Sequence, residues 1–121
     1  MSYPVDRRFA RAAPPFPLNV RFEIQRQRIE GAEVIDLSMA GLGVWVPENF
    51  LPLLELNALL KEVTIDRLHL PHMPHLGRLV FFNLMGQSAR PGYLMAGIEY
   101  LHASQVYQEA MAKFLEPLLE P

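Results

Sequence analysis

Arginine side chains gather near the N-terminus, where the sequence reads Asp6-Arg7-Arg8-Phe9-Ala10-Arg11. Arg7 and Arg11 form an RxxxR pattern, and Arg8 adds a guanidinium between them. A guanidinium is a planar fork of donors that binds phosphate oxygens in pairs, stacks on aromatic faces and pairs with guanine O6 and N7. A ligand that carries both phosphates and guanines would engage each of these abilities.

A second polar segment, Asp36-Leu37-Ser38-Met39-Ala40-Gly41, has the pattern DxSxxG at the end of an expected strand. Because side chains alternate along a strand, we expect Asp36 and Ser38 on the outer wall and their apolar neighbours inside. Gly41 can adopt backbone conformations closed to other residues, and its missing side chain lets a ligand approach. A carboxylate beside a hydroxyl suits the amino edge of a guanine.

The elements that must position these groups are mostly strands. Apolar residues alternate at Leu18, Val20, Phe22 and Ile24, which is typical of a half-buried strand. Further strands are expected at 32–38, 42–46, 62–70, 76–85 and 93–101, with a turn near 29–31. The leucine-rich stretch 48–60 fits either a loop over a barrel end or a short helical turn.

The C-terminal segment changes period. From Ser104, a suitable N-cap, apolar residues recur every fourth position, with Tyr107 and Met111 beside them: Val106, Ala110, Phe114 and Leu118. This pattern predicts an amphipathic helix over about 104–118 that Pro117 ends or kinks. Strands followed by one helix indicate an antiparallel sheet or barrel rather than βαβ units.

RxxxR in an N-terminal arm, about thirty residues before DxSxxG, resembles the two-part signature of PilZ domains. The segment Ala96-Gly97-Ile98-Glu99-Tyr100 also resembles the closing strand of that family. The resemblance covers nearly the whole chain and implies an all-β fold, a six-stranded antiparallel barrel with a C-terminal helix. It also implies a set of ligand-binding residues: Arg7, Arg11, Asp36, Ser38 and Gly41, with Arg8 as a helper.

The function that this resemblance implies is reversible binding of the bacterial second messenger cyclic di-GMP, without a cofactor. A flexible arm over residues 1–17 would close on the ligand against a barrel over 18–121, and the new surface would be recognised by a separate partner protein, in motility or biofilm control. The alternative within the same fold is a protein-interaction module that does not bind the nucleotide.

Composition limits the other classes of function. The chain has 121 residues, enough for one domain, with 50% hydrophobic residues, no cysteine and a formal net charge of −2. This balance disfavours a nucleic-acid polymer as partner. The sequence has no signal peptide and no long apolar run, which predicts a cytoplasmic protein without membrane insertion. Enzyme motifs such as a glycine-rich phosphate loop or HExxH are absent, so we do not expect an enzyme.

Three features keep alternatives open. His69, His72 and His75 can be metal ligands of an unrelated β-domain, but the intervening prolines favour an ordinary loop. Trp45 can stack a guanine or pack against the helix or arm, and we expect packing. The run 79–82 is apolar on both faces, so either the C-terminal helix or a second subunit covers its outer face, and we expect the helix.

Overall fold

The computed structural model describes residues 10–84 and 89–119. Six strands, a short 3-10 helix and one α-helix follow each other: β1 (Asn19–Ile24), β2 (Gln27–Leu37), β3 (Gly41–Pro47), η1 (Glu48–Leu53), β4 (Leu59–Ile65), β5 (Gly77–Asn83), β6 (Tyr93–Tyr100) and α1 (Gln105–Leu119). The leucine-rich stretch after β3 therefore begins as a helical turn. The fourth strand lies a few residues earlier than the sequence predicts, because residues 66–76 form a loop.

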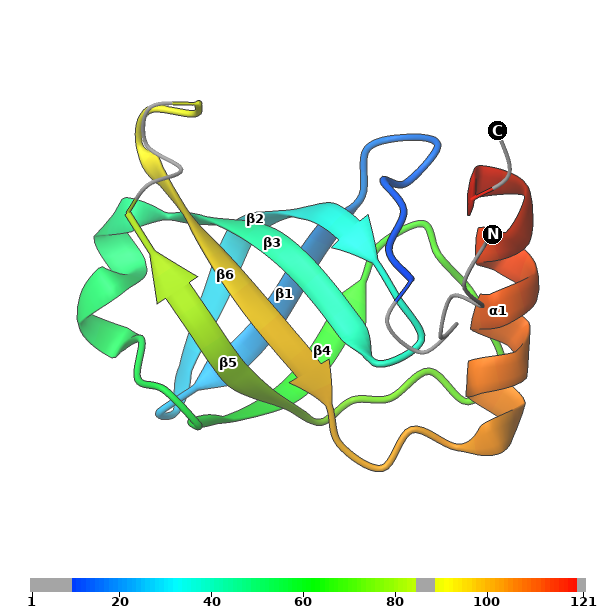
Figure 1. The fold of residues 1–121 in the computed structure, drawn as a ribbon. Helices are drawn as coiled ribbons and strands as arrows, with labels where there is room; N and C mark the ends of the chain where they lie inside the picture. Colours follow the sequence, from blue (N-terminus) through cyan, green and yellow to red (C-terminus); the bar gives the residue numbers. More distant parts are fainter. Residues whose placement is uncertain (1–9, 85–88, 120–121) are drawn as a thin grey trace, which may run out of the picture.

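The strands close into a barrel in the order β1-β2-β3-β6-β5-β4, with every neighbouring pair antiparallel (Figure 1). Alternate residues of each strand fill its interior, as Val20, Phe22 and Ile24 do in β1, each about 1% exposed. The six-stranded antiparallel barrel with a C-terminal helix is confirmed.

The first hairpin turns at Gln25 and Arg26, both with positive φ, and Ile24 pairs with Gln27 across this two-residue turn. The expected turn near 29–31 is wrong. Gly31, with φ of +81°, lies inside β2 at a register shift between β1 and β2. The glycine therefore marks a β-bulge, which needs the same backbone freedom as a turn.

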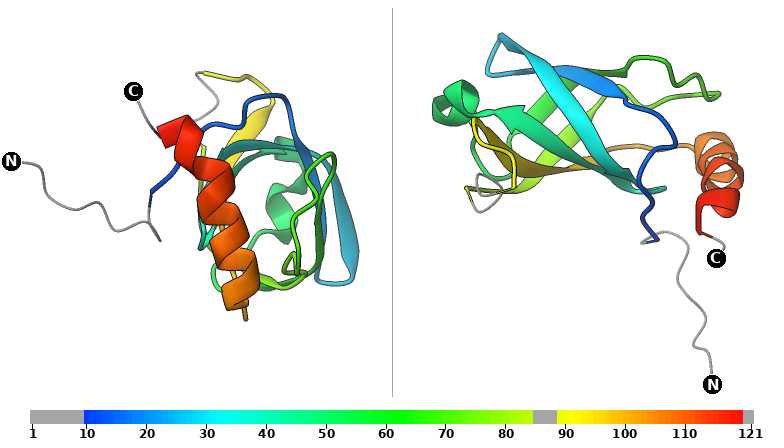
Figure 2. Two further views of the ribbon diagram at one scale, coloured as in Figure 1. Left: turned by 90° about the vertical axis from the view of Figure 1, so that its right-hand side faces the viewer. Right: turned by 90° about the horizontal axis from the view of Figure 1, so that it is seen from above.

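Helix α1 lies across one end of the barrel, beside the turn between β2 and β3, and η1 covers the opposite end (Figures 1 and 2). The outer face of β5 is not beneath α1, so the expectation that this helix covers residues 79–82 is wrong. The helix begins where predicted, because Ser104 Oγ accepts a hydrogen bond from the Tyr107 N–H at 3.1 Å.

The apolar stripe of α1 is shifted by one residue from the predicted stripe. Tyr107, Met111 and Leu115 are buried against the barrel end, whereas Val106 is 47% exposed. Both sets recur every fourth residue, so the period was predicted correctly and the phase was not. Pro117 lies inside the helix, which continues to Leu119 instead of ending at the proline.

Alanine substitutions in the buried and in the exposed stripe of α1 measure how much each stripe contributes to the free energy of unfolding. Met111→Ala is expected to lower the free energy of unfolding by about 2–5 kcal/mol, because it opens a cavity between helix and barrel. Val106→Ala, on the exposed face, should change it by less than about 0.5 kcal/mol. Urea denaturation measures both values, and equal losses would contradict the observed phase of the helix.

The rings of Tyr100 in β6 and Tyr107 in α1 meet edge to face, with centroids 5.5 Å apart. Both hydroxyls are buried, and neither has a hydrogen-bond partner among the described residues. Burial raises the pKa of Tyr100 to about 12, and burial also raises the pKa of Tyr107.

Because of this tyrosine pair, the free energy of unfolding depends on pH in the alkaline range. Unfolded tyrosine releases its proton near pH 10, so above that pH the unfolded state binds fewer protons than the folded state. The free energy of unfolding should therefore fall between pH 10 and 12, by up to about 1.4 kcal/mol per pH unit for each tyrosine. Urea denaturation at pH 8, 10 and 11 tests this, and Tyr100→Phe should show a smaller fall than the original chain.

Candidate functional site

One antiparallel bridge attaches the N-terminal segment to the barrel. The Ala12 N–H donates to the Leu37 carbonyl at 3.0 Å, and the Leu37 N–H donates to the Ala12 carbonyl at 2.9 Å. Ala12 is 8% exposed, and Phe16 packs against the core under the guanidinium of Arg67, 5.0 Å from the ring centre. Residues 10–17 therefore lie on the barrel, and the mobility of the arm stays a prediction.

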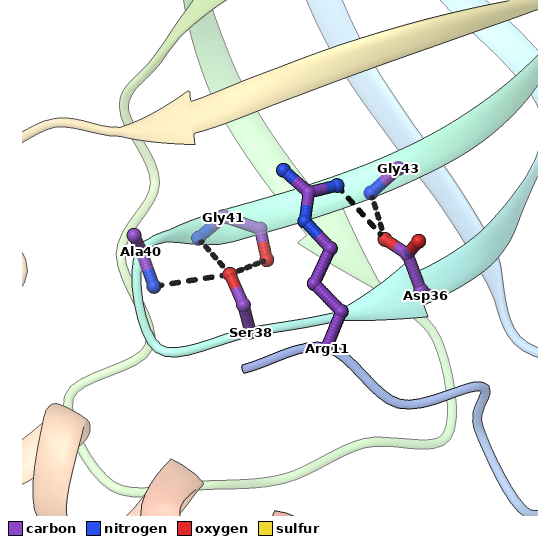
Figure 3. Close-up of polar contacts among 6 residues, drawn as sticks. All are labelled: Arg11, Asp36, Ser38, Ala40, Gly41 and Gly43. Atoms are coloured by element: carbon purple, nitrogen blue, oxygen red, sulfur yellow. Dashed lines mark hydrogen bonds and ion pairs between the residues drawn. The ribbon is translucent and has the colours of Figure 1, made fainter. Parts of the chain in front are cut away.

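The bridge places Arg11 beside Asp36. Arg11 Nη1 donates to Asp36 Oδ1 at 3.2 Å, and the backbone N–H of Gly43 donates to the same oxygen at 3.0 Å (Figure 3). The Asp36 side chain is 28% exposed, on the outer wall as predicted, and Arg11 is 51% exposed. The structure thus brings together one residue from each of the two motifs. Arg7 and Arg8 lie outside the described residues.

Ser38 closes the turn between β2 and β3. Its Oγ accepts hydrogen bonds from the Ala40 and Gly41 N–H groups at 3.3 and 3.1 Å and donates to the Gly41 carbonyl at 3.2 Å (Figure 3). Ser38 is only 4% exposed. The expectation that Ser38 stands on the outer wall is therefore wrong, because the chain turns there and its hydroxyl lies inside the turn.

The structure gives Gly41 a packing constraint, and its role toward a ligand stays a prediction. Its φ is not positive, unlike that of Gly31 and Gly92, and a Cβ at this position would collide with the Ile98 carbonyl of β6. The missing side chain thus permits close approach of β3 and β6. The prediction of an unusual backbone conformation at Gly41 is wrong.

Two further glycines lie on the outer side of β3 and β6, where side chains of the neighbouring strands β2 and β5 cover them. Gly43 and Gly97 are register partners, and their strands turn the neighbouring residues, such as Leu42 and Ile98, into the core. A Cβ on Gly97 would fall on the Phe81 ring, so this ring lies directly against the glycine. We call Gly41, Gly43 and Gly97 the glycine floor.

Ion pairs and large side chains surround the glycine floor. Arg11 and Asp36 lie at its β2 side, whereas Arg78 and Glu99, with Nη2 and Oε2 3.2 Å apart, lie on the β5 and β6 side. Trp45 faces outward from β3, half buried and in register with Met95 of β6. The sequence analysis missed Arg78 and Glu99, although outward positions follow from their inward neighbours Leu79 and Ile98.

A third pair at the same wall is fully engaged. Arg90 Nη1 and Nη2 donate to both carboxylate oxygens of Glu33 at 2.6 and 2.9 Å, and the guanidinium lies 4.0 Å from the centre of the Tyr93 ring. Hydrogen bonds from Arg90 lower the pKa of Glu33. This pair holds the segment before β6 against β2, and both oxygens of its carboxylate are occupied by the guanidinium.

The histidine loop offers no metal site in the described part of the chain. No three His, Asp or Glu side chains within residues 10–84 and 89–119 gather closely enough to hold a metal ion. His75 Nδ1 lies 3.3 Å from the Val63 carbonyl in a local contact.

None of the helices within residues 10–84 and 89–119 is both long and apolar enough to cross a bilayer.

Comparison with known proteins finds likeness in structure but not in sequence. No family model and no curated protein matches the chain. The crystal structure of YcgR in complex with c-di-GMP from Escherichia coli superimposes with a TM-score of 0.65 at 16% identity, over 93% of this chain and 46% of that chain. The PilZ domain with c-di-GMP of YcgR from Escherichia coli gives 0.64 at 14% identity, over 94% and 92%.

The chain thus spans less than half of the longer YcgR chain and nearly all of its PilZ domain. At identities of 14% and 16%, the likeness shows that the backbones are arranged alike and does not show which ligand this chain binds. Barrel order, C-terminal helix and coverage agree with the resemblance that the two motifs suggest, and the chain has the fold of a PilZ domain.

Proposed function

We propose that this chain is a receptor for cyclic di-GMP that binds the nucleotide on the outer wall formed by β2, β3 and β6. The observation that carries the proposal is the contact between Arg11 and Asp36, which joins two motifs 25 residues apart at one point of the surface. Both YcgR structures were solved with c-di-GMP, which supports the same ligand for a chain of the same fold. No enzymatic step is part of this proposal.

Arg11 and Asp36 are arranged for complementary tasks. Both hydrogen bonds that Asp36 accepts from described residues end on Oδ1, so Oδ2 can accept from the N1–H and N2–H groups of a guanine. Arg11 uses one of its five N–H donors on Asp36 and keeps the others for phosphate oxygens or for the guanine face. The ligand can therefore bind without breaking the ion pair.

The glycine floor is covered by two side chains that a base can contact. The Asp36 carboxylate lies against Gly43 and the Phe81 ring lies against Gly97, so a planar purine can stack on the Phe81 ring beside the carboxylate. Ser38 and Gly41 act in this proposal by holding the turn and the β3–β6 contact in shape. They belong to the site as positioning residues, although the family resemblance implies direct ligand binding.

The signal would pass through the N-terminal arm. Arg7 and Arg8 precede the bridged segment, so they can fold over a ligand that already contacts Arg11. Closing the arm would change the surface beside β2, and we propose that a separate cytoplasmic protein, in motility or biofilm control, recognises this change.

The alternative function is a PilZ-fold module that binds a protein and no nucleotide. The half-buried apolar side chains of Trp45, Met95 and Phe81 on the wall favour it, because aromatic residues and methionine are enriched at protein interfaces. Absence of nucleotide binding, together with an intact fold, would support this alternative.

Calorimetric titration of cyclic di-GMP into the full chain tests the receptor. We expect micromolar or tighter binding, which corresponds to about −8 kcal/mol or better. Arg11→Ala and Asp36→Ala should each weaken binding by about tenfold or more, because each removes a charge-assisted hydrogen bond. Guanosine triphosphate should give no heat at the same concentrations.

Arg28→Ala is the matched control for Arg11→Ala. Arg28 is also exposed, at 59%, and its guanidinium lies 3.7 Å from a carboxylate, that of Glu30, but on the first hairpin. Its substitution should leave the affinity unchanged. Equal losses in both variants would mean that the arginines act only through net charge, and absence of binding in the original chain would refute the receptor.

The Ser38→Ala variant tests whether Ser38 only holds the β2–β3 turn in shape or also contacts the ligand. Loss of the hydroxyl removes the side-chain hydrogen bonds of the turn and should lower the free energy of unfolding by about 1–2 kcal/mol. Affinity for cyclic di-GMP should fall by less than about tenfold, since the ligand contacts themselves remain. Thr64→Ala, which removes an exposed hydroxyl bonded to the Glu62 carbonyl at 3.1 Å, serves as the control and should alter neither value. A large loss of affinity without loss of stability would show direct contact by Ser38.

A further inference from the structure

A second arginine–carboxylate pair lies on the outer wall beyond the glycine floor. Arg78 of β5 and Glu99 of β6 are register partners, and Glu99 is in turn the register partner of Gly41. Arg78 Nη2 donates to Glu99 Oε2 at 3.2 Å, and the side chains are 42% and 46% exposed. The pair is therefore accessible and stands at the glycine that ends the DxSxxG motif.

The two pairs face each other across the floor. Asp36 is in β2 and Glu99 is in β6, so two strand spacings, roughly 10 Å, separate their backbones across the sheet, with a further offset along β3 because Asp36 pairs with Gly43 and Glu99 with Gly41. The glycine floor lies between them, covered by the Asp36 carboxylate at Gly43 and by the Phe81 ring at Gly97. One ligand of the size of a cyclic dinucleotide can span this distance over the Phe81 ring.

A hollow opens beside Glu99, between the turn of the DxSxxG motif and the start of α1. It has a volume of about 430 Å³, and its lining includes Met39, Ala40, Glu99, Tyr100 and Gln108. Ligand pockets in proteins generally measure about 300–1,000 Å³, so the hollow is large enough for a base with its sugar. Met39 and Ala40 of its lining belong to the turn of the DxSxxG motif, and the remaining walls come from the end of β6, the loop after it and α1.

The chemistry of the second pair matches a guanine. Guanine presents O6 and N7 as acceptors and N1–H and N2–H as donors, so an arginine and a carboxylate side by side can read both edges. The Arg78–Glu99 contact uses one nitrogen and one oxygen, and within residues 10–84 and 89–119 the other oxygen of Glu99 has no hydrogen-bond partner. By contrast, Arg90 already occupies both oxygens of Glu33.

We propose that Arg78 and Glu99 recognise the second guanine of cyclic di-GMP, in the hollow beside the β2–β3 turn. This inference rests on the proposed receptor function and adds the residues that select a ligand with two guanines. Asp36 and Arg11 bind the first guanine, and Glu99 and Arg78 bind the other across the glycine floor. A single ligand molecule then occupies the wall.

Calorimetry with two ligands tests the assignment. The probes are cyclic di-GMP and 3′,3′-cyclic GMP–AMP, in which adenine replaces one guanine. The original chain should prefer cyclic di-GMP by about tenfold or more, because adenine at the second position offers no N1–H donor to Glu99. In Glu99→Gln and Arg78→Ala, binding of cyclic di-GMP should weaken until the two ligands bind alike.

Arg21→Ala is the matched control. Arg21 pairs with Asp66 at 2.9 Å, the side chains are 40% and 44% exposed, and both residues line another hollow, of about 390 Å³. This pair lies on β1 and the end of β4, away from the β2–β3 turn. The preference between the two ligands should be unchanged in Arg21→Ala, and thermal unfolding of all variants checks that the fold is intact.

The outcomes separate this inference from the receptor itself. If the original chain binds cyclic di-GMP and Arg78→Ala and Glu99→Gln retain the full preference, the second guanine is not read here and the inference is overturned, while the receptor stands. A loss of preference in Arg21→Ala equal to that in Arg78→Ala would also overturn it. If the original chain binds neither ligand, the proposed function fails first, and this inference fails with it.

Discussion

The close approach of β3 and β6 is the contact on which the rest of the structure depends. These strands are distant in sequence, yet they share seven register pairs that join the β2–β3 hairpin to β6 and thus to α1. The approach is possible only without a side chain at Gly41, where a Cβ would meet the Ile98 carbonyl. Gly97 meets a similar requirement between β6 and β5, because a Cβ there would meet the Phe81 ring. Closing the barrel therefore also shapes its outer surface at β3 and β6.

A second constraint is local and acts on the arm. The two hydrogen bonds between Ala12 and Leu37 fix the chain at the last residue of β2, and they place Arg11 opposite Asp36. An exposed ion pair of this kind contributes little stability, on the order of 0–1 kcal/mol. The ion pair instead fixes geometry, because it holds a guanidinium and a carboxylate side by side. A ligand that used both groups would lose less side-chain entropy on binding.

Much of this arrangement could be predicted from the sequence, because the strands alternate with a period of two and the two motifs are local patterns. The predictions failed where a pattern leaves a choice that only packing decides. Tyr107 and Val106 both begin four-residue apolar repeats, and the shape of the barrel end selects the first. An unusual backbone conformation was predicted for Gly41 because the sequence does not reveal that β6 lies beside it. Arg78 was missed for the same reason, since its neighbour Glu99 is 21 residues away.

Charge balance on the wall assigns different tasks to the arginines. Arg11 with Asp36, and Arg78 with Glu99, are each neutral as pairs, so they offer hydrogen bonds in fixed directions but little net attraction for a doubly negative ligand. Neutral pairs suit the recognition of a base, which carries no charge but has ordered donors and acceptors. In the proposed receptor, most of the attraction for the phosphates would come from cations without a carboxylate beside them, and Arg7 and Arg8 add two positive charges against the single Asp6. Base selection would then belong to the wall, and charge neutralisation would belong mainly to the arm.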